Sequence, residues 1–177
     1  MRLLKICFFS LFIISCATPR VTYDYDRNVD YDNYKSYNFY PDIRTGLNQL
    51  DDKRFFTQID SVMQLKGLYK SEAPDIYVNI IVREYEIPSQ SAVGIGIGTG
   101  GRNTRVGVSG GIPVGSSRIG QEITIDLIDV KRNELYWQAT AKGRMPINAT
   151  PFEREQYYKA MANKIFGPYP PKVKAKE

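Results

Sequence analysis

Histidine is missing from this sequence, and the only two cysteines stand at positions 7 and 16. Without an imidazole the chain cannot build a His-dependent catalytic triad or a histidine-ligated metal site. Strong charge is missing too, because a formal net charge of +5 over 177 residues is only mildly basic. That balance is not the profile of a nucleic-acid-binding protein, so we expect no nucleic-acid partner.

A long apolar run is also absent. The run Ile6–Ile14, preceded by Arg2 and Lys5, has about half of the roughly 20 residues that a membrane-spanning helix needs. A short apolar run behind basic residues is typical of a secretion signal. The alternatives are an ordinary signal peptide that happens to contain a cysteine and a signal processed at Cys16.

The four residues Ile13, Ile14, Ser15 and Cys16 resemble the lipobox of bacterial lipoproteins. That resemblance implies a diacylglycerol on the Cys16 thiol, cleavage before it and acylation, as by palmitate, of the new amine. Each buried acyl methylene contributes about 0.8 kcal/mol, so two or three chains anchor a protein essentially permanently. We therefore expect a signal peptide over residues 1–15 and a lipidated tether over residues 16–20.

The lipobox interpretation decides the fate of both cysteines. Cys7 leaves with the signal peptide and Cys16 carries lipid, so no disulfide, thiolate catalysis or zinc–thiolate site is expected. Ala17 and Thr18 follow without an aspartate, which favours sorting to the outer membrane, on its periplasmic or surface face. The membrane, reached through the lipid, is then the first expected partner, and no cofactor or metal is expected.

Alternation of apolar and polar residues predicts strands at residues 21–26, at 36–40 and, most strongly, at 76–86. Residues 121–145 read as a β-hairpin that turns at residues 131–133. The residues of this hairpin predicted to face inward are Ile123, Ile125 and Leu127, then Leu135, Trp137, Ala139 and Ala141.

Two segments show helical spacing instead. The first carries Phe55, Phe56, Ile59, Val62 and Met63 on one face, with Asp51 or Asp52 near its start and Gly67 after its end. The second is predicted to begin at Thr150 as N-cap, with Pro151 and Glu153 completing a capping box. Its apolar stripe is Tyr158, Met161, Ala162 and Ile165.

These elements predict an α+β fold: a two-layer sandwich of a mostly antiparallel sheet, two helices packed on one face and a glycine-rich β-hairpin. Short polar turns between the strands favour antiparallel pairing. We expect a single domain over residues 21–167. The last residues, 168–177, have no apolar period, and we expect a mobile C-terminal tail.

Nine of the fourteen glycines lie between Ser91 and Gly115. A phosphate cradle needs a strand, a glycine turn and then a helix, and no helical period follows here. Alternation predicts a glycine-faced hairpin formed by Val93, Gly94, Ile95, Gly96, Ile97 and Gly98, with Val106 and Val108 on its return. One alternative is a flexible hairpin whose glycines ease twist. The other is an interaction surface for self-pairing or strand addition.

Other polar patterns give weaker signals. Asp24, Asp26 and Asn28 open like a calcium loop, but Val29 replaces the required glycine and the pattern fails, which favours a solvated strand edge. Two carboxylate pairs were considered for glycoside hydrolysis: Asp126 with Asp129, and Glu84 with Glu86. Neither Asp126 nor Asp129 has an evident partner in the sequence that would tune its pKa. The crowded early tyrosines favour half-buried packing over a sugar platform.

The chain resembles bacterial lipoproteins of the domain of unknown function 4136 family. The resemblance rests on VTYDYDRNVDYDNYKSYNFY, APDIYVNIIV, the glycine-rich middle, EITIDLIDVKRNELYWQATAKG and the ending IFGPYPP. The turn KRN departs from the glycine-containing turn commoner in the family. The family implies an α+β envelope domain and supplies no activity, so no catalytic residue is carried over.

The sequence therefore predicts a membrane-anchored envelope lipoprotein that is not an enzyme and that binds another envelope protein or a cell-wall polymer through a sheet edge or the glycine hairpin. The alternative is an envelope hydrolase using carboxylates, which a pocket of convergent Asp and Glu side chains would favour. A ligand carrier, with an apolar cavity that the helices fail to seal, is a third hypothesis.

Overall fold

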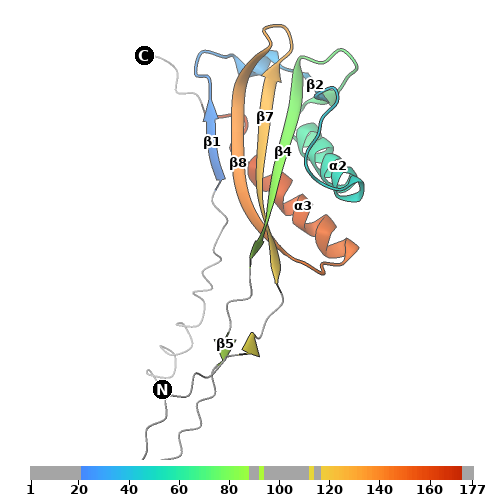
Figure 1. Cartoon of the computed structure of the whole chain (residues 1–177). Coiled ribbons are helices and arrows are strands. Elements are labelled where there is room, and N and C mark those ends of the chain that lie inside the picture. Colours follow the sequence, from blue (N-terminus) through green and yellow to red (C-terminus); the bar gives the residue numbers. More distant parts are fainter. Residues whose placement is uncertain (1–20, 88–91, 94–111, 114–116, 173–177) are drawn as a thin grey trace, which may run out of the picture.

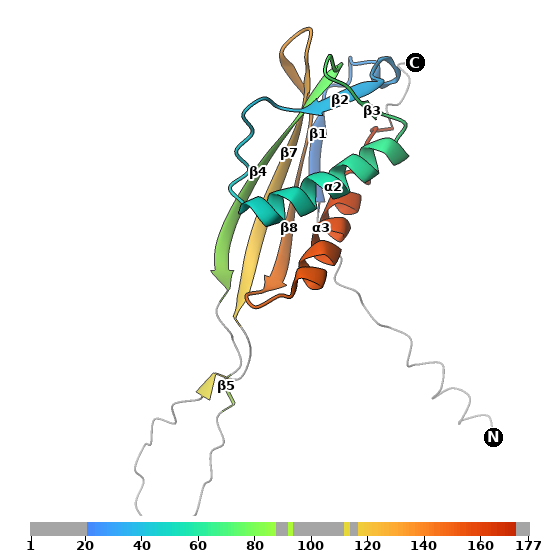
Figure 2. The same ribbon diagram turned by 90° about the vertical axis from the view of Figure 1, so that its right-hand side faces the viewer.

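The computed structural model describes residues 21–87, 92–93, 112–113 and 117–172. Its main feature is a six-stranded sheet with two helices on one face (Figures 1 and 2). The strands, in the order β1-β8-β7-β4-β2-β3, are β1 (Val21–Tyr25), β8 (Glu134–Pro146), β7 (Arg118–Asp129), β4 (Ile76–Ile87), β2 (Ser36–Phe39) and β3 (Tyr69–Lys70). The helices are α2 (Gln49–Leu65) and α3 (Pro151–Ile165), and a short 3-10 turn, η2 (Tyr31–Asn33), precedes β2. The predicted two-layer α+β sandwich is confirmed.

The centre of the sheet is antiparallel, as the alternation predicts. β4 pairs with β7 from Ile76 opposite Asp129 to Ile87 opposite Arg118, and β7 pairs with β8 as a hairpin. Alternate residues of β4 face the helices and are buried, namely Ile76, Val78, Ile80 and Val82. β-branched side chains suit this pleated, half-buried position, which explains why the strongest sequence signal marks the central strand.

The pairing of β2 departs from the antiparallel expectation. β2 runs parallel to both β3 and β4, because α2 carries the chain back before β4 begins. Parallel neighbours need a crossover of this kind. The first predicted strand, β1, pairs instead with β8 at the opposite edge of the sheet, so the two N-terminal strands are separated by three others.

Both helices bury the faces that their sequence periods predict. Asp51 and Asp52 lie in the first turn of α2, near its start as predicted, and Asn48 is the N-cap, its side chain accepting from the backbone N–H groups of Leu50 and Asp51. Gly67, with a φ of 85°, follows the end of α2 as predicted. The α3 capping box of Thr150 and Glu153 forms as predicted.

An ion pair joins the starts of the two helices. Asp51 is 1% exposed and accepts from Arg54 at 2.8 Å and from Arg154 of α3 at 2.5 Å. A buried carboxylate is costly unless it is paired in this way. Asp51 lies in the first turn of α2, three residues after the N-cap Asn48, and from there its carboxylate holds α2 to α3.

A β-bulge changes the predicted phase of the returning strand. Leu127 pairs with Trp137, but Ile128 pairs with Leu135, so Tyr136 is the extra residue. Because a bulge inserts one unpaired residue, the side chains before it switch faces. Tyr136 is therefore buried, and Leu135, predicted to face inward, is 52% exposed.

The packed body extends past the predicted domain end at residue 167. Tyr169 is 4% exposed, lies 5.4 Å from the ring of Trp137 and shares a hydroxyl contact of 3.2 Å with Tyr136. Pro171 is buried as well. The start of the tail at residue 168 was wrong, because aromatic packing on Trp137 fixes the residues after α3.

A separate two-stranded sheet continues the hairpin of β4 and β7. It consists of β5 (Ala92–Val93) and β6 (Ile112–Pro113), with Val93 opposite Ile112 in antiparallel register. No helix among the described residues is long and apolar enough to cross a membrane.

Candidate binding surface

The two faces of the six-stranded sheet have different environments. Both helices pack on one face, and no described element covers the other, which we call the open face (Figure 1). By register it carries the side chains of Thr22, Asp24, Asn38, Tyr77, Asn79, Ile81, Glu122, Thr124, Asp126, Ile128, Gln138, Thr140 and Lys142. This mixture of polar, charged and apolar groups is suited to contact with a partner.

Hydrogen bonds across the strands fix the polar side chains of the open face. Asp126 of β7 accepts from the amide of Gln138 at 2.7 Å and from that of Asn79 at 3.3 Å. One rung away, the hydroxyls of Thr124 and Thr140 are 2.9 Å apart. Cross-strand bonds reduce the entropy that these side chains would lose on binding, so the open face is preorganised.

Two hollows lie side by side on the open face and share Leu135. One, of about 340 Å³, is lined by Tyr40, Asn79, Asp126, Ile128, Asn133 and Leu135. The other, of about 250 Å³, is lined by Asp24, Tyr25, Asp26, Leu135, Tyr136, Trp137 and Gln138. The bulge at Tyr136 turns Leu135 outward, so the same irregularity that completes the core shapes this surface.

Tyr40 contributes an exposed aromatic surface to the larger hollow. Tyr40 is 41% exposed, and its ring meets the ring of Tyr77 edge-on, with centroids 5.5 Å apart. An aromatic ring beside amide and carboxylate groups offers an apolar platform with hydrogen-bonding partners at its side. That combination suits the alternating apolar and hydroxyl surfaces of a sugar ring.

A third cavity, of about 550 Å³, lies at the end of the sheet where β4 begins and the β7–β8 turn stands. Its lining is Asn28, Val29, Asp30, Asn33, Tyr34, Asp75, Asp129, Lys131 and Arg132. We call it the end cavity. Three carboxylates line it, and all three accept hydrogen bonds from backbone: Asp30, which caps η2, and Asp75 and Asp129.

Asp75 receives three hydrogen bonds in this cavity, from the backbone of Lys35 and Ser36 and from the Ser36 hydroxyl at 2.8 Å. The Lys35 N–H bond, with the Ser36 bonds behind it, holds the pKa of Asp75 below its usual value even though partial burial opposes it. An aspartate held in this way ties the entry of β2 to the start of β4 and is not poised as a general acid.

Asp129 also accepts hydrogen bonds that hold it in place. Burial alone would raise its pKa, but bonds from the Arg132 backbone, the Tyr34 hydroxyl and the Arg132 guanidinium lower it overall. The same surroundings, burial first and the bond to Asp129 second, raise the pKa of Tyr34 to about 12. No partner for Asp129 was predicted from the sequence, although Arg132 stands only three residues away; Tyr34, the other partner, is distant along the chain.

The carboxylate pairs considered for hydrolysis do not converge. Asp126 points to the open face and Asp129 to the end cavity, since the two are an odd number of residues apart on β7. Glu84 accepts from the buried amide of Gln121 at 2.6 Å. Neither Glu84 nor Glu86 lines the hollows or the end cavity.

The calcium-like segment forms local turns. Asp24 accepts from the backbone of Tyr25, and Asp26 from that of Asn28, each at 2.8 Å. Across the described ranges, no three His, Cys, Asp or Glu side chains are grouped closely enough to hold a metal ion.

The early tyrosines pack as predicted, with Tyr34 stacked on Tyr136 at 4.5 Å and Tyr31 5.7 Å from the same ring. Tyr37 is completely buried and donates to Asp60 of α2 at 2.8 Å. Most of these rings therefore stabilise the fold. Two of the early group line hollows of the open face: Tyr25 lines the smaller one, and Tyr40, just after β2, lines the larger one beside Asp126.

Most of the residues that the sequence singled out lie outside the described ranges. These are the lipidation candidate Cys16 and the hairpin positions Gly94, Ile95, Gly96, Ile97, Gly98, Val106 and Val108. Of the predicted hairpin only Val93 is placed, in β5. The sequence analysis in turn missed Tyr40 and Leu135, since neither the parallel pairing of β2 nor the bulge has a local signal.

These features define a class of protein: a two-layer α+β domain with a helix-covered sheet face and an open one. The chain belongs to the family described as domain of unknown function (DUF4136), whose model matches residues 21–171. No curated protein matches the chain.

Two solved structures are similar to this chain. A PDZ domain protein from Parabacteroides distasonis shares 16% identity with a TM-score of 0.52, covering 85% of this chain and 35% of its own, which shows a common fold. This chain thus spans about a third of that protein. The PelC dodecamer from Paraburkholderia phytofirmans shares 12% identity, with 85% and 97% coverage and a TM-score of 0.47.

Proposed function

We propose that this protein is a lipid-anchored lipoprotein of the bacterial outer membrane that binds a hydroxyl-rich envelope polymer on its open face without catalysing a reaction. The observation that carries this proposal is the larger hollow. There the exposed ring of Tyr40 stands beside Asp126, whose carboxylate oxygens are held by the amides of Gln138 and Asn79.

The chemistry of the hollow favours binding over hydrolysis. A hydrolase of sugars needs two carboxyl groups flanking the bond to be cleaved. The larger hollow contains one carboxylate, Asp126, together with the amide of Asn79 and apolar surface from Ile128. One acceptor, one donor and an aromatic ring bind a sugar without supplying an acid and a nucleophile.

Anchoring is supported by the lipobox-like sequence that ends at Cys16, close before the start of β1 at Val21. Its test is Cys16→Ala, expressed in the native host. The wild-type protein is expected in the membrane fraction and to incorporate labelled palmitate, whereas the variant is expected to lose the label and to stay out of the membrane. Equal labelling of the two proteins would contradict the proposal.

Binding is tested by sedimenting the full-length protein, solubilised in mild detergent, with insoluble polysaccharide isolated from the host envelope. Tyr40→Ala removes an aromatic contact of about 1 kcal/mol, so we expect binding to weaken several-fold. Asp126→Asn is expected to weaken it as well. The matched control is Tyr69→Ala, which removes a tyrosine that is 61% exposed on β3.

Two outcomes would contradict a noncatalytic, polymer-binding open face. One is equal sedimentation of the Tyr40 and Tyr69 variants. The other is release of reducing sugar ends by the wild-type protein, which would favour the envelope hydrolase instead.

The glycine-rich segment remains a predicted interaction surface for another envelope protein. The specific observation in its favour is that β5 and β6 pair antiparallel at its base, as a hairpin requires. Deletion of residues 94–111 tests it. A variant that folds, keeps polymer binding and loses a crosslinked protein partner in whole cells would support this second role, and one that keeps every crosslink would exclude it.

A further inference from the structure

β1 begins toward the same end of the sheet as the one at which β4 ends and β7 begins. Val21, the first residue of β1, is level across the sheet with Ala141, Ile123 and Val82. From that level β4 continues to Ile87, the last residue of its ladder with β7. At about 3.4 Å per residue, the end of the sheet lies about 17 Å beyond the start of β1.

The tether has nearly the same reach. Cys16 and Val21 are separated by the short segment 17–20, and an extended chain spans at most about 3.6 Å per residue, so the Cys16 backbone can stand no farther than about 18 Å from Val21. A lipidated Cys16 can therefore draw level with the end of the sheet at Ile87 but cannot place the bilayer far beyond it.

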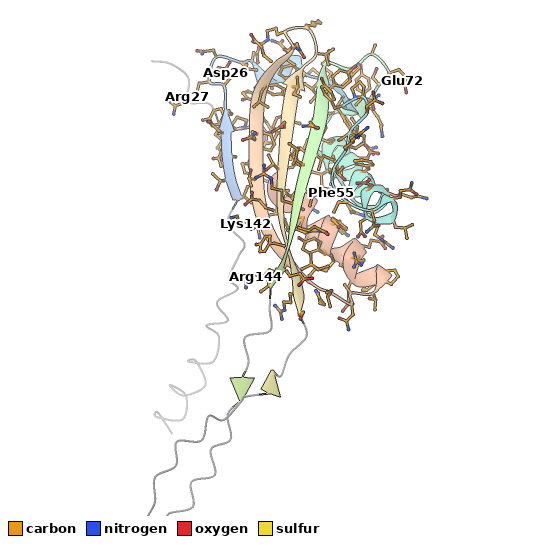
Figure 3. The ribbon with its side chains drawn as sticks, viewed as in Figure 1. Asp26, Arg27, Phe55, Glu72, Lys142 and Arg144 are labelled. Atoms are coloured by element: carbon orange, nitrogen blue, oxygen red, sulfur yellow. The ribbon has the colours of Figure 1, made fainter. Side chains whose placement is uncertain are left out.

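The described residues at that end present apolar and basic groups to solvent, together with two exposed carboxylates, Glu86 beside Ile87 and Glu153 in the first turn of α3. In the loop from β8 into α3, Ile147 is 47% exposed, and Phe152 in the first turn of α3 is 68% exposed. Arg118 and Arg144 are exposed at the last rungs of β7 and β8, and Figure 3 shows Arg144 at the end of the body from which the β5 strand extends.

The sequence that leaves this end is free of carboxylates. Residues 87–121 contain no Asp or Glu, and their only charged side chains are Arg102, Arg105 and Arg118. Guanidinium groups pair well with the phosphates of lipid headgroups, whereas carboxylates would be repelled by them. An acid-free segment is therefore compatible with close approach to a lipid surface.

We propose that the end of the body formed by Ile87, Arg118, Arg144, Ile147 and Phe152, which we call the basal end, rests on the bilayer surface. The partner is the lipid surface itself, with apolar side chains at the acyl boundary and arginines at the phosphates. This orientation rests on the proposed lipid anchor. In this orientation the end cavity and the part of the open face around Tyr40 point away from the membrane, so that a polymer can reach Tyr40.

Single-cysteine labelling tests this orientation on the acylated, full-length protein in lipid vesicles. Cys7 leaves with the signal and Cys16 is acylated, so an introduced cysteine is the one free thiol. Asn148→Cys places a spin label at the exposed loop after β8, and Glu72→Cys places one at the opposite end of the body. Along the 12 residues of β4 these ends are about 40 Å apart.

The readout is relaxation of each label by a nickel chelate attached to the lipid headgroups. We expect strong relaxation at position 148 and little at position 72. Arg144→Cys and Lys131→Cys repeat the comparison at the two ends, in case either first variant misfolds. Equal relaxation at the two ends, or stronger relaxation at position 72, would overturn the basal-end proposal.

A lengthened tether sharpens the test. With about 15 Gly and Ser residues inserted after Arg20, the anchor no longer restricts the body, since a flexible linker of that length spans about 20 Å on average. Relaxation at position 148 is expected to fall, and an unchanged signal would overturn the role assigned to tether length. Mass measurement of the acyl group on each sample separates the lipid-anchor proposal from the basal-end proposal. An unacylated Cys16 would contradict the anchor. An acylated protein whose two ends relax equally would contradict only the orientation.

Discussion

The side chains of one strand, β7, point alternately to the two faces of the sheet. Ile123, Ile125 and Leu127 point to the helices and are completely buried. The residues between them, Thr124 and Asp126, point to the open face and are only half-buried. Alternate positions of the same strand therefore have separate roles: one set fills the apolar core, and the other holds polar groups in place on the open face.

The covered face supplies most of the stability. Burial of a large aliphatic or aromatic side chain contributes about 1.5–3 kcal/mol, and the covered face contains an unbroken cluster of such residues from both helices and the central strands. On the open face, cross-strand pairs contribute about 0.2–1 kcal/mol each. Substitutions should therefore have large effects on unfolding on the first face and small ones on the second.

The largest expected effect is at Trp137, which is completely buried and stacks on Phe166 with centroids 5.8 Å apart. Trp137→Ala should lower the free energy of unfolding by about 3–5 kcal/mol because it leaves a large cavity. Urea denaturation measures the change. Trp137→Phe should cost much less, because it keeps a ring and removes an indole N–H that has no hydrogen-bond partner among the described residues.

The next effect compares two glycines on opposite faces. A Cβ at Gly143 would collide with the Tyr157 hydroxyl and come within 2.9 Å of the Met161 sulfur under α3, so Gly143→Ala should cost about 2–3 kcal/mol. The nearest atoms to a Cβ at Gly120 belong to the ring of Tyr85 on the open face, and Tyr85 is 45% exposed and can swing away. Denaturation midpoints of both variants, measured together, should show the larger loss for Gly143.

Acidification should weaken the junction at the end cavity. The folded-state pKa values of Asp75 and Asp129 are lowered, so their stabilisation is present above the unfolded pKa of about 3.9 and is lost as the pH falls through the folded values. Asp129→Asn should cost about 1–2 kcal/mol at pH 7 and less at pH 3. Denaturation at the two pH values measures this, and an equal cost at both would contradict the assigned role of the carboxylate.

The smallest effect is expected on the open face. Thr140→Val removes the hydroxyl contact with Thr124 but keeps the shape and the β-branch, so the free energy of unfolding should change by less than about 1 kcal/mol. A loss of unfolding free energy as large as that of Trp137→Ala would show that the open face also contributes strongly to stability. It would contradict the assignment of most of the stability to the covered face.

The predictable part of the fold is the part with a local signal. Alternation marks β4 and most of β7 and β8, and the pattern of Thr150, Pro151 and Glu153 fixes the start of α3. These patterns act within a few residues, so they can be recognised in a single sequence.

The missed features depend on distant partners. Asn48 caps α2 and donates its side-chain amide to Asp51, which also accepts from Arg154 of α3, and Tyr169 packs against the ring of Trp137. The bulge that turns Leu135 outward is decided by how Tyr136 packs against the early tyrosines. For the same reason the hollow beside Tyr40 could not be foreseen, because three strands and the β7–β8 turn combine to form it.

Hydroxyl-radical footprinting of the protein in intact cells, compared with footprinting of the purified protein, tests most directly whether the open face is a binding surface. If the open face binds its partner in the envelope, Tyr40, Ile128 and Leu135 should be oxidised in the purified protein and protected in cells, while Tyr69 on β3 should react equally in both. Equal oxidation of Tyr40 and Leu135 in the two samples would contradict a binding role for the open face.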